Sequence, residues 1–364
     1  MNDAILELLP GIHLFIIIPM LALIILVPLA IKQSRVKNKR RSIDWGFAKD
    51  LEKKLNIDIN QFCNETVNSR LESSRKKYLG QICILVIFIS ICAAAIFYNI
   101  IRGFDSNISI IEFLVEAIIE IVLLFIVQKI TSNYERLYKK IIVEPILKSL
   151  YPDIIYNSEK NIHMQSEYAK LGFDNMYYLV KCETKDYFEG MIDGKIHFEM
   201  ADLKAYKEDI DESFGYRNKR RLLKDVVFRG LFSSIECTKG IGENKILILH
   251  STTKVKPQKY KVELGNTELK KDFNVFSENP ELASKFLTNE IINIILEFYK
   301  SLNVCFDIII MQNQIYFRFF TNYIFETDVL EKEINKDQIL LYCFIIDFIT
   351  KFTRSFNAIL DSVD

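Results

Sequence analysis

Residues 187–206 read "YFEGMIDGKIHFEMADLKAY", two runs of alternating apolar and polar side chains on either side of Asp193 and Gly194. Alternation with a period of two is typical of β-strands that bury one face. An Asp-Gly pair between two such runs is a strong signal for a tight β-hairpin. The stretch therefore predicts two antiparallel strands joined by a short turn, and it indicates a sheet in this half of the chain.

The residues around this hairpin carry further strand and helix signals. Runs rich in β-branched and aromatic residues predict more strands, and one pair of them flanks a tight turn at Asn313. Helical spacing of apolar residues predicts three helices. We expect an α+β domain in which an antiparallel sheet packs against these helices. The further strands are predicted at 176–182, 225–238, 245–252, 259–265, 304–312 and 314–321, and the helices at 132–153, 280–302 and 336–360.

The first third of the chain has a different composition, with three long apolar runs at 12–31, 81–101 and 110–128. A helix of about 20 apolar residues is long enough to cross the hydrocarbon core of a bilayer. We therefore expect an α-helical membrane part of three transmembrane helices ahead of the α+β domain.

Basic residues set the expected orientation of these helices. The first run is followed by "KQSRVKNKRR" (32–41), with six basic residues in ten, whereas no Lys or Arg precedes it. Other basic clusters stand before the second run and after the third. Because cytoplasmic flanks are enriched in Lys and Arg, the N-terminus should lie outside and the C-terminal domain in the cytoplasm. The sequence thus predicts a multi-pass protein of the inner (plasma) membrane.

This organisation divides the chain into four parts. They are an N-terminal membrane helix with its basic flank (1–41), a cytoplasmic helical connector (42–80), a membrane helical hairpin (81–131) and the cytoplasmic α+β domain (132–364).

The third apolar run contains Glu112, Glu116 and Glu120, each four residues from the next. On an α-helix this spacing places the three side chains on one stripe. An ionised carboxylate within the hydrocarbon costs several kcal/mol, so these groups must face other helices, be protonated or have partners. The partner candidates are Arg102 at the hairpin tip and the polar side chains of the second run. Glu112, Glu116, Glu120 and Arg102 form the candidate intramembrane polar seam.

Three interpretations of this seam remain open. It is a proton- or ion-linked pathway, or hydrogen-bonding glue between packed helices, or part of an amphipathic stretch outside the membrane. Intramembrane acids mark ion pathways, but only one helix carries them here. We favour the packing interpretation, in which Ser90, Asn99 and Gln81 of the second run are the neighbouring polar groups.

Enzyme signatures are not found in this sequence. Lys and Arg number 47, as do Asp and Glu, so no net charge points to a nucleic acid or another polyanion. The seven cysteines lack metal-site spacing, and no nucleophile elbow, phosphate loop or zinc-protease motif occurs. "KGIGEN" (239–244) contains a GxG, but it lies between two strands and is interpreted as a hairpin turn. We therefore expect no catalytic, cofactor-binding or metal-binding residues, and no cofactor.

The order of motifs resembles a known family. "DYFEGMIDGKIHFEMADLKA", "VVFRGLFSSIECTK" followed by "KILIL", "DFNVFSENPELASKFLTNEIINIILEF", and then "QIYFRFF" and "FET" are similar to the bacterial family DUF3137 over roughly residues 70–360. The resemblance implies a pair of membrane helices ahead of a cytoplasmic domain, without an established activity. It also implies a membrane-associated partner, for which a LemA-type membrane protein is the candidate.

Two functions from different classes are consistent with this sequence. One is a membrane-anchored scaffold or binding protein whose cytoplasmic domain engages a protein or lipid partner, with self-association as a further option. The alternative is a small transporter or channel subunit that uses the glutamate stripe. Polar rather than acidic residues on the second run favour the scaffold.

Overall fold

The computed structural model describes residues 65–102, 107–157, 164–171, 180–210, 222–253, 260–263, 265–302, 304–321 and 336–362. The described residues form two compact units, a helical hairpin up to Ile141 and an α+β domain from Ile142 onward. The predicted membrane helix at 12–31 and most of the connector lie outside the described residues.

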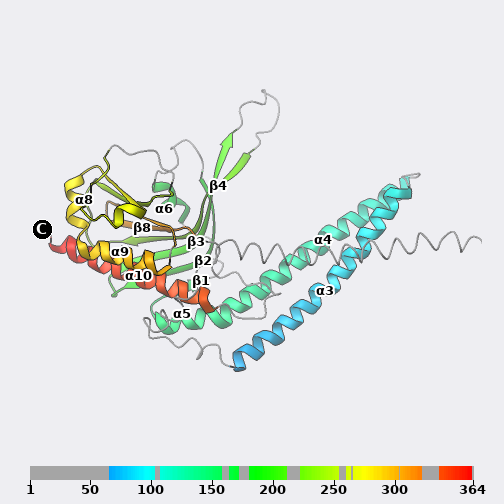
Figure 1. Cartoon of the computed structure of the whole chain (residues 1–364). Helices are drawn as coiled ribbons and strands as arrows, with labels where there is room; N and C mark the ends of the chain where they lie inside the picture. Colours follow the sequence, from blue (N-terminus) through cyan, green and yellow to red (C-terminus); the bar gives the residue numbers. More distant parts are fainter. Residues whose placement is uncertain are drawn as a thin grey trace, which may run out of the picture. The chain divides into compact units, whose positions relative to one another are not determined.

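The hairpin consists of α3 (Glu65–Arg102) and α4 (Asn107–Tyr138), which run antiparallel and side by side (Figure 1). The rings of Tyr78 on α3 and Tyr134 on α4 meet edge to face with centroids 5.9 Å apart, which fixes the register of the two helices. Helix α3 is continuous through residues 80 and 81, where the sequence suggested the end of the connector.

Helix α4 continues without a break into the π-helix η3 (Lys139–Val143) and then into α5 (Glu144–Leu150). Pro145 lies at the start of α5 and has no N–H to donate to the carbonyl of Ile141, so the α-helical ladder is interrupted in this turn. The boundary between the two units falls within η3, after Ile141. One helical segment therefore links the hairpin to the domain.

One described helical stretch, Ser69–Ile96 within α3, is long and apolar enough to cross a membrane, with a mean hydropathy of 2.6 and none of its apolar window buried. The prediction of three membrane helices is therefore not confirmed. The multi-pass arrangement remains a proposal.

The domain is built on an eight-stranded antiparallel sheet in the order β1-β2-β3-β4-β8-β7-β5-β6. This confirms the predicted antiparallel α+β architecture. The strands are β1 (Ile155–Asn157), β2 (Val180–Ile192), β3 (Ile196–Ile210), β4 (Leu222–Glu236), β5 (Lys245–His250), β6 (Phe273–Ser277), β7 (Phe306–Met311) and β8 (Gln314–Phe319).

Both predicted tight turns are confirmed. Asp193, Gly194 and Lys195 join β2 to β3, and Asp193 and Gly194 have φ values of 54° and 67°, the left-handed conformations typical of a tight hairpin turn. Gln312, with φ 54°, and Asn313 join β7 to β8. The register of each hairpin follows from its turn, with Ile192 opposite Ile196 and Met311 opposite Gln314.

The interpretation of "KGIGEN" as a hairpin turn is wrong, because the strands it joins, β4 and β5, are separated in the sheet by β8 and β7. The segment instead covers the β7–β8 turn. The N–H of Cys237 donates to the carbonyl of Asn313, and that of Ile241 donates to the carbonyl of Gln312, both at 2.7 Å. Gly240 permits this approach, since a Cβ there would lie 2.9 Å from the oxygen of Gln312.

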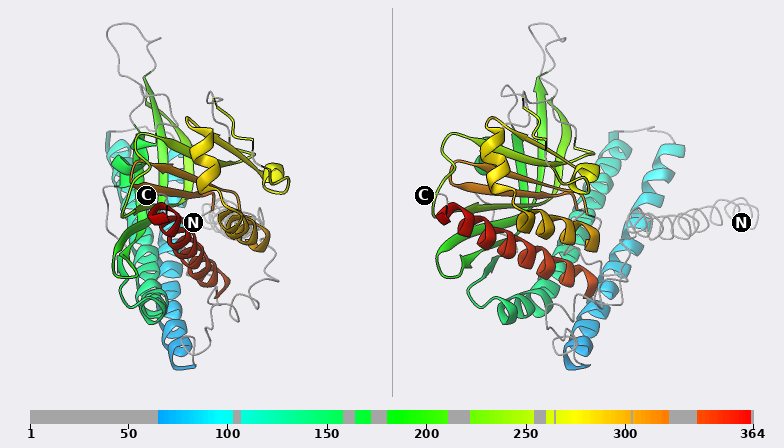
Figure 2. Two further views of the ribbon diagram at one scale, coloured as in Figure 1. Left: turned by 90° about the vertical axis from the view of Figure 1, so that its left-hand side faces the viewer. Right: turned by 60° about the vertical axis from the view of Figure 1, so that its left-hand side comes forward.

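Helices cover the sheet on both faces. Helices α9 (Asn289–Leu302) and α10 (Lys336–Ser362) lie side by side on one face (Figures 1 and 2). Their Phe298 and Phe348 pack on rings of β7 and β8. On the opposite face, Tyr168 of the short helix α6 (Met164–Lys170) packs on Phe228 and Phe232 of β4. Because successive side chains of a strand point to opposite faces, the sheet contributes to two apolar layers, one on each face.

Several elements differ from the prediction, and three of the differences lie between residues 259 and 302. The helix expected at 280–302 is two helices, α8 (Pro280–Phe286) and α9, because the side chain of Thr288 accepts from the N–H of Ile291 and caps a new helix. The short helix α7 (Leu269–Asp272) and strand β6 precede them, where no strand was predicted. The strand predicted at 259–265 is reduced to a single bridge between Lys261 and Phe276.

Candidate functional site

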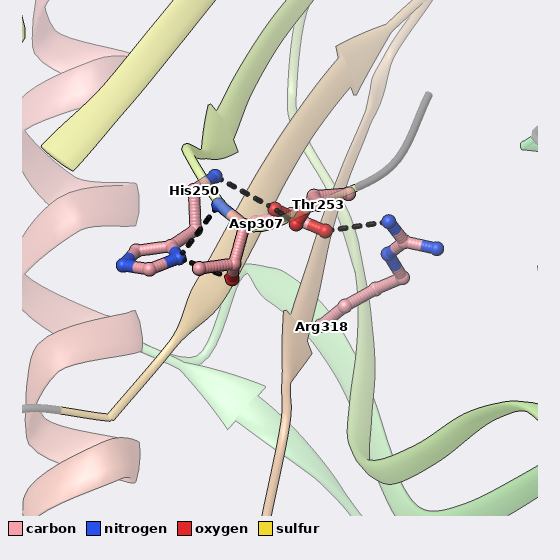
Figure 3. A network of polar contacts seen from close by, with 5 residues as sticks. His250, Thr253, Asp307 and Arg318 are labelled. Atoms are coloured by element: carbon pink, nitrogen blue, oxygen red, sulfur yellow. Dashed lines mark hydrogen bonds and ion pairs between the residues drawn. The ribbon is translucent and has the colours of Figure 1, made fainter. Parts of the chain in front are cut away.

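A buried ion pair lies at the centre of the polar network in Figure 3. Asp307 on β7 stands directly opposite Arg318 on β8, and the Nη2 of Arg318 donates to the Oδ2 of Asp307 at 2.5 Å. Asp307 is 0% exposed and Arg318 is 4% exposed. An ion pair so far from water stays charged only where hydrogen bonds satisfy both groups.

Further hydrogen bonds stabilise the carboxylate of Asp307. Its Oδ1 accepts from the backbone N–H of His250 and from the hydroxyl of Thr253, each at 2.9 Å (Figure 3). The guanidinium of Arg318 lies over the rings of Phe228 and Phe320, with centroid distances of 5.8 and 5.5 Å. The network therefore ties the end of β5 and its following turn to the β7–β8 hairpin, and it acts as a structural link.

The imidazole of His250 belongs to a second chain of hydrogen bonds. The N–H of Thr252 donates to Nδ1 at 3.3 Å, so the ring proton lies on Nε2, which donates to the hydroxyl of Tyr299 at 3.2 Å. That hydroxyl donates in turn to Asp272 at 3.4 Å. Burial lowers the pKa of His250 and outweighs the opposing effect of the Asp307 and Asp272 charges. The geometry and the pKa both favour the neutral ring.

We expect the domain to lose stability as the pH falls below about 6.5, the usual pKa of an unfolded histidine. Because the pKa of His250 is lowered in the folded state, the unfolded chain binds more protons in this range. The contribution of His250 is fully present above pH 6.5 and is lost as the pH falls through its folded pKa. An NMR titration of the imidazole checks this, with His250→Gln identifying the resonance. A His250 pKa of 6.5 or above would contradict it.

A second group of buried polar side chains lies where β2, β3 and α10 meet. The hydroxyl of Tyr342 donates to Asp202 at 2.9 Å, and that of Tyr156 donates to Asp186 at 2.5 Å. Asp186 has φ 50° and lies in a register shift of β2 between Lys185 and Phe188. Burial and the nearby carboxylates raise the pKa of Tyr342 well above its usual value, so this phenol remains a donor. Like the ion pair, this group of side chains links neighbouring elements of the fold, and it does not form an open binding site.

The structure places Glu116 and Glu120 on the face of α4 that packs against α3. The partly buried positions of α4 recur every three or four residues down to Tyr134, which contacts α3. Glu116, Glu120, Leu123, Val127 and Ile130 belong to this series, and Ala117, Thr131, Ser132 and Asn133 beside them are also partly buried. Such spacing marks one helix face, so the two glutamates continue the interhelical seam. The side chains of Glu112 and Arg102, like that of Asn99, lie outside the described part.

The structure describes the side chains of two of the predicted partners on α3. Ser90 donates its hydroxyl to the carbonyl of Val86 in its own helix at 2.9 Å, and Gln81 is exposed. Glu120 lies fourteen residues before Tyr134, whose ring contacts Tyr78. Because the two helices are antiparallel and have the same rise per residue, the residue of α3 at the depth of Glu120 lies fourteen residues after Tyr78, at Cys92. The neighbouring groups of Glu120 on α3 are therefore those around Cys92.

Sequence reasoning missed Asp307 and Arg318, although a signal for them exists. Each is the lone charge in an apolar strand, in "CFDIII" and "IYFRFF", and each is separated from the turn at residues 312 and 313 by the same number of residues. A two-residue turn places such positions opposite each other, so the pair could be predicted from spacing alone. Among the described residues, no group of three or more His, Cys, Asp or Glu side chains is arranged to hold a metal ion.

Comparison with known proteins supports the family resemblance. Residues 226–358, from β4 into α10, match the family model DUF3137, which is described as a protein of unknown function. Among solved structures, the chain is similar to the crystal structure of the mycobacterial trehalose monomycolate transport factor A, TtfA. The two share 12% sequence identity with a TM-score of 0.31, over 57% of this chain and 86% of that one. None of the curated proteins matches the chain.

Proposed function

We propose that this chain, whose residues 226–358 carry the DUF3137 family region, is a scaffold or binding protein anchored in the inner (plasma) membrane. In this proposal the hairpin crosses the bilayer, and the α+β domain engages a protein or lipid partner in the cytoplasm without catalysis. Besides membrane lipid, the partner is a second copy of the chain or a LemA-type membrane protein, the latter on the basis of the family resemblance.

The observation that carries this proposal is the apolar outer surface of the hairpin. A contiguous apolar surface of this kind is unfavourable in water, and among soluble proteins such patches mark sites that another molecule covers. Hydrocarbon chains are the matching solvent for two long helices of this composition. The exposed large apolar side chains are Ile84, Ile87, Phe88 and Ile91 on α3, and Ile111, Leu114, Val115, Ile118, Ile119, Ile121, Val122, Leu124, Phe125 and Ile126 on α4.

The α+β domain differs from the hairpin in this respect. Its apolar side chains form two buried layers, and its exposed large ones, among the described residues, are Ile155, Met191, Val226 and Tyr260. Water is a suitable solvent for such a surface. The contrast supports an anchor and a soluble module in one chain, with the N-terminus outside and the domain inside as the basic flanks suggest.

Fractionation tests this proposal directly. The full chain should stay with membranes after extraction at alkaline pH, which removes peripheral proteins. A fragment of residues 132–364 should be found in the soluble fraction and unfold cooperatively by circular dichroism. Release of the full chain by alkaline extraction would refute the membrane anchor, and a fragment that shows no cooperative transition would refute the independent domain.

A second candidate function, a transporter or channel subunit, is favoured by the position of Glu116 and Glu120 on the face toward α3. Carboxyl groups on an interhelical face are found in proton and ion pathways as well as in packed interfaces. The two functions differ in whether the carboxyl group must ionise. Substitution of Glu120 separates them.

We expect Glu120→Gln to leave the α3–α4 interface unchanged, because the amide keeps the shape and hydrogen bonding of a protonated carboxyl group. Glu120→Ala should weaken helix association by about 0.6–2 kcal/mol. Reversible unfolding of the hairpin in mixed micelles measures both, and Leu124→Ala on the outer face is the matched control. A cation or proton flux in proteoliposomes that Glu120→Gln removes would support transport instead.

A further inference from the structure

The register of the hairpin sets the depth of its polar residues. Tyr78 and Tyr134 are in contact and so lie at the same depth. Three residues from each of them, toward the apolar part of each helix, are Gln81 on α3 and Thr131 on α4. The apolar runs of both helices lie beyond this level. The backbone of Lys129 lies about 3 Å on the apolar side of this level, by the helical rise. Its flexible side chain is long enough to bring the ammonium group back to the level of Gln81 and Thr131. Gln81 and Thr131 therefore mark the edge of the apolar part of the hairpin.

Exposed cations gather just outside this edge. Lys76 and Lys77 on α3 and Arg136 on α4 are exposed and lie about 6–8 Å beyond it at the helical rise. The headgroup layer of each leaflet is roughly 5–8 Å thick. Arg70 and Lys140, also exposed, lie about 14–17 Å beyond the edge, within roughly one Debye length of that layer. We call these five residues the basic collar.

Among the described residues near the collar, the two carboxylates, Glu72 and Glu135, are engaged mainly by buried cations. The carboxylate of Glu72 accepts from Nε and Nη2 of Arg75 at 2.6 and 2.8 Å, and that of Glu135 lies 2.7 Å from the ammonium of Lys139. Arg75 and Lys139 are buried, so these pairs are largely neutral. Lys76 has a further contact with Glu72, at 3.8 Å. Among the described residues around the collar, Lys and Arg therefore outnumber carboxylates.

We propose that the basic collar binds the phosphate groups of anionic phospholipids in the adjacent leaflet, in preference to zwitterionic lipids. This inference rests on the proposed membrane placement of the hairpin. Clustered cations close to a helix end attract anionic headgroups through charge, and the attraction weakens as salt screens it. The same contacts hold the hairpin at a fixed depth.

Spin-labelled lipids test this in the full chain reconstituted into phosphatidylcholine vesicles. We expect the immobilised fraction of labelled phosphatidylglycerol to show about a 3–10-fold preference over labelled phosphatidylcholine in 50 mM salt, falling in 500 mM salt. The triple variant Lys76→Gln, Lys77→Gln and Lys140→Gln should lose most of this preference. The control variant replaces Lys195, Lys271 and Lys285 with Gln. These lysines are exposed on the α+β domain, so the change of charge is the same as in the collar variant.

The outcomes are distinguishable. If both lipids are immobilised equally by the wild-type chain, the hairpin is in the bilayer and the collar has no preference, which overturns this inference alone. If neither lipid is immobilised, the membrane placement itself fails. A preference that the control variant loses as fully as the collar variant would also contradict the inference, as would one that high salt leaves unchanged.

Discussion

Replacing Asp307 with alanine is expected to lower the free energy of unfolding of the α+β domain by about 3–5 kcal/mol, because removal of one partner leaves a buried charge without its counterion. The substitution removes the acceptor of Arg318 and also that of the His250 N–H and the Thr253 hydroxyl. Asp307→Asn should cost less, since the amide oxygen still accepts from His250 and Thr253.

Urea unfolding of residues 132–364, followed by circular dichroism, measures these changes. Arg354→Ala is the matched control, since it also breaks an arginine–carboxylate pair, in which Arg354 donates to Asp193 at 2.5 and 2.7 Å. That pair is exposed, and solvent screens it, so the midpoint should move little. Equal effects of Asp307→Ala and Arg354→Ala would show that the buried network does not hold the sheet together.

Truncating Phe348 to alanine should destabilise the domain by about 3–5 kcal/mol, the range for removal of a buried aromatic ring. Phe348 is 3% exposed and stacks on Phe298 with centroids 4.0 Å apart. It also meets Phe306 and Phe317 edge to face, at 5.4 and 5.6 Å. Its loss leaves a cavity where α9, α10 and the sheet come together, and rigid strands cannot close it.

Ile155→Ala provides the comparison for this substitution. Ile155 lies on β1 and is 59% exposed, so its truncation should change the free energy of unfolding by no more than about 0.5 kcal/mol. Phe348→Leu keeps most of the apolar volume and should fall between the two. A loss below 1 kcal/mol in Phe348→Ala would mean that this aromatic layer is not the core of the domain.

The parts of the fold that local chemistry determines were predictable from the sequence. Asp193 and Gly194 define a turn by their backbone conformations, and alternation on both sides then defines the strands. The same holds for the turn at Asn313. The long helix at 336–360 was predicted from its period and is observed as α10, Lys336–Ser362.

Elements that depend on tertiary context could not be predicted in this way. Strand β6, with five residues, runs almost directly into Pro280, so its alternation is short and merges with the start of a helix. The order of the sheet also escaped prediction, since a loop between two strands looks the same whether or not they pair. The segment at 239–244 was misinterpreted for this reason.

The candidate seam was predictable in one respect and not in another. The spacing of Glu116 and Glu120 places them on one stripe, and the structure has both on the face toward α3. Which groups of α3 lie opposite depends on the register of the hairpin, which the Tyr78–Tyr134 contact sets and no local pattern encodes. Ser90 satisfies its hydroxyl within its own helix for a similar reason, since the Val86 carbonyl is always within reach.

In the proposed topology the helical hairpin crosses the membrane and holds the α+β domain in the cytoplasm. Fusion of a reporter enzyme that is active only outside the cytoplasm tests it most directly. We predict that the reporter inserted at Ser106, between α3 and α4, is active, and that the same reporter fused after Asp364 is silent. Activity after Asp364 with silence at Ser106 would reverse the orientation, and silence at both positions would contradict a hairpin that spans the membrane.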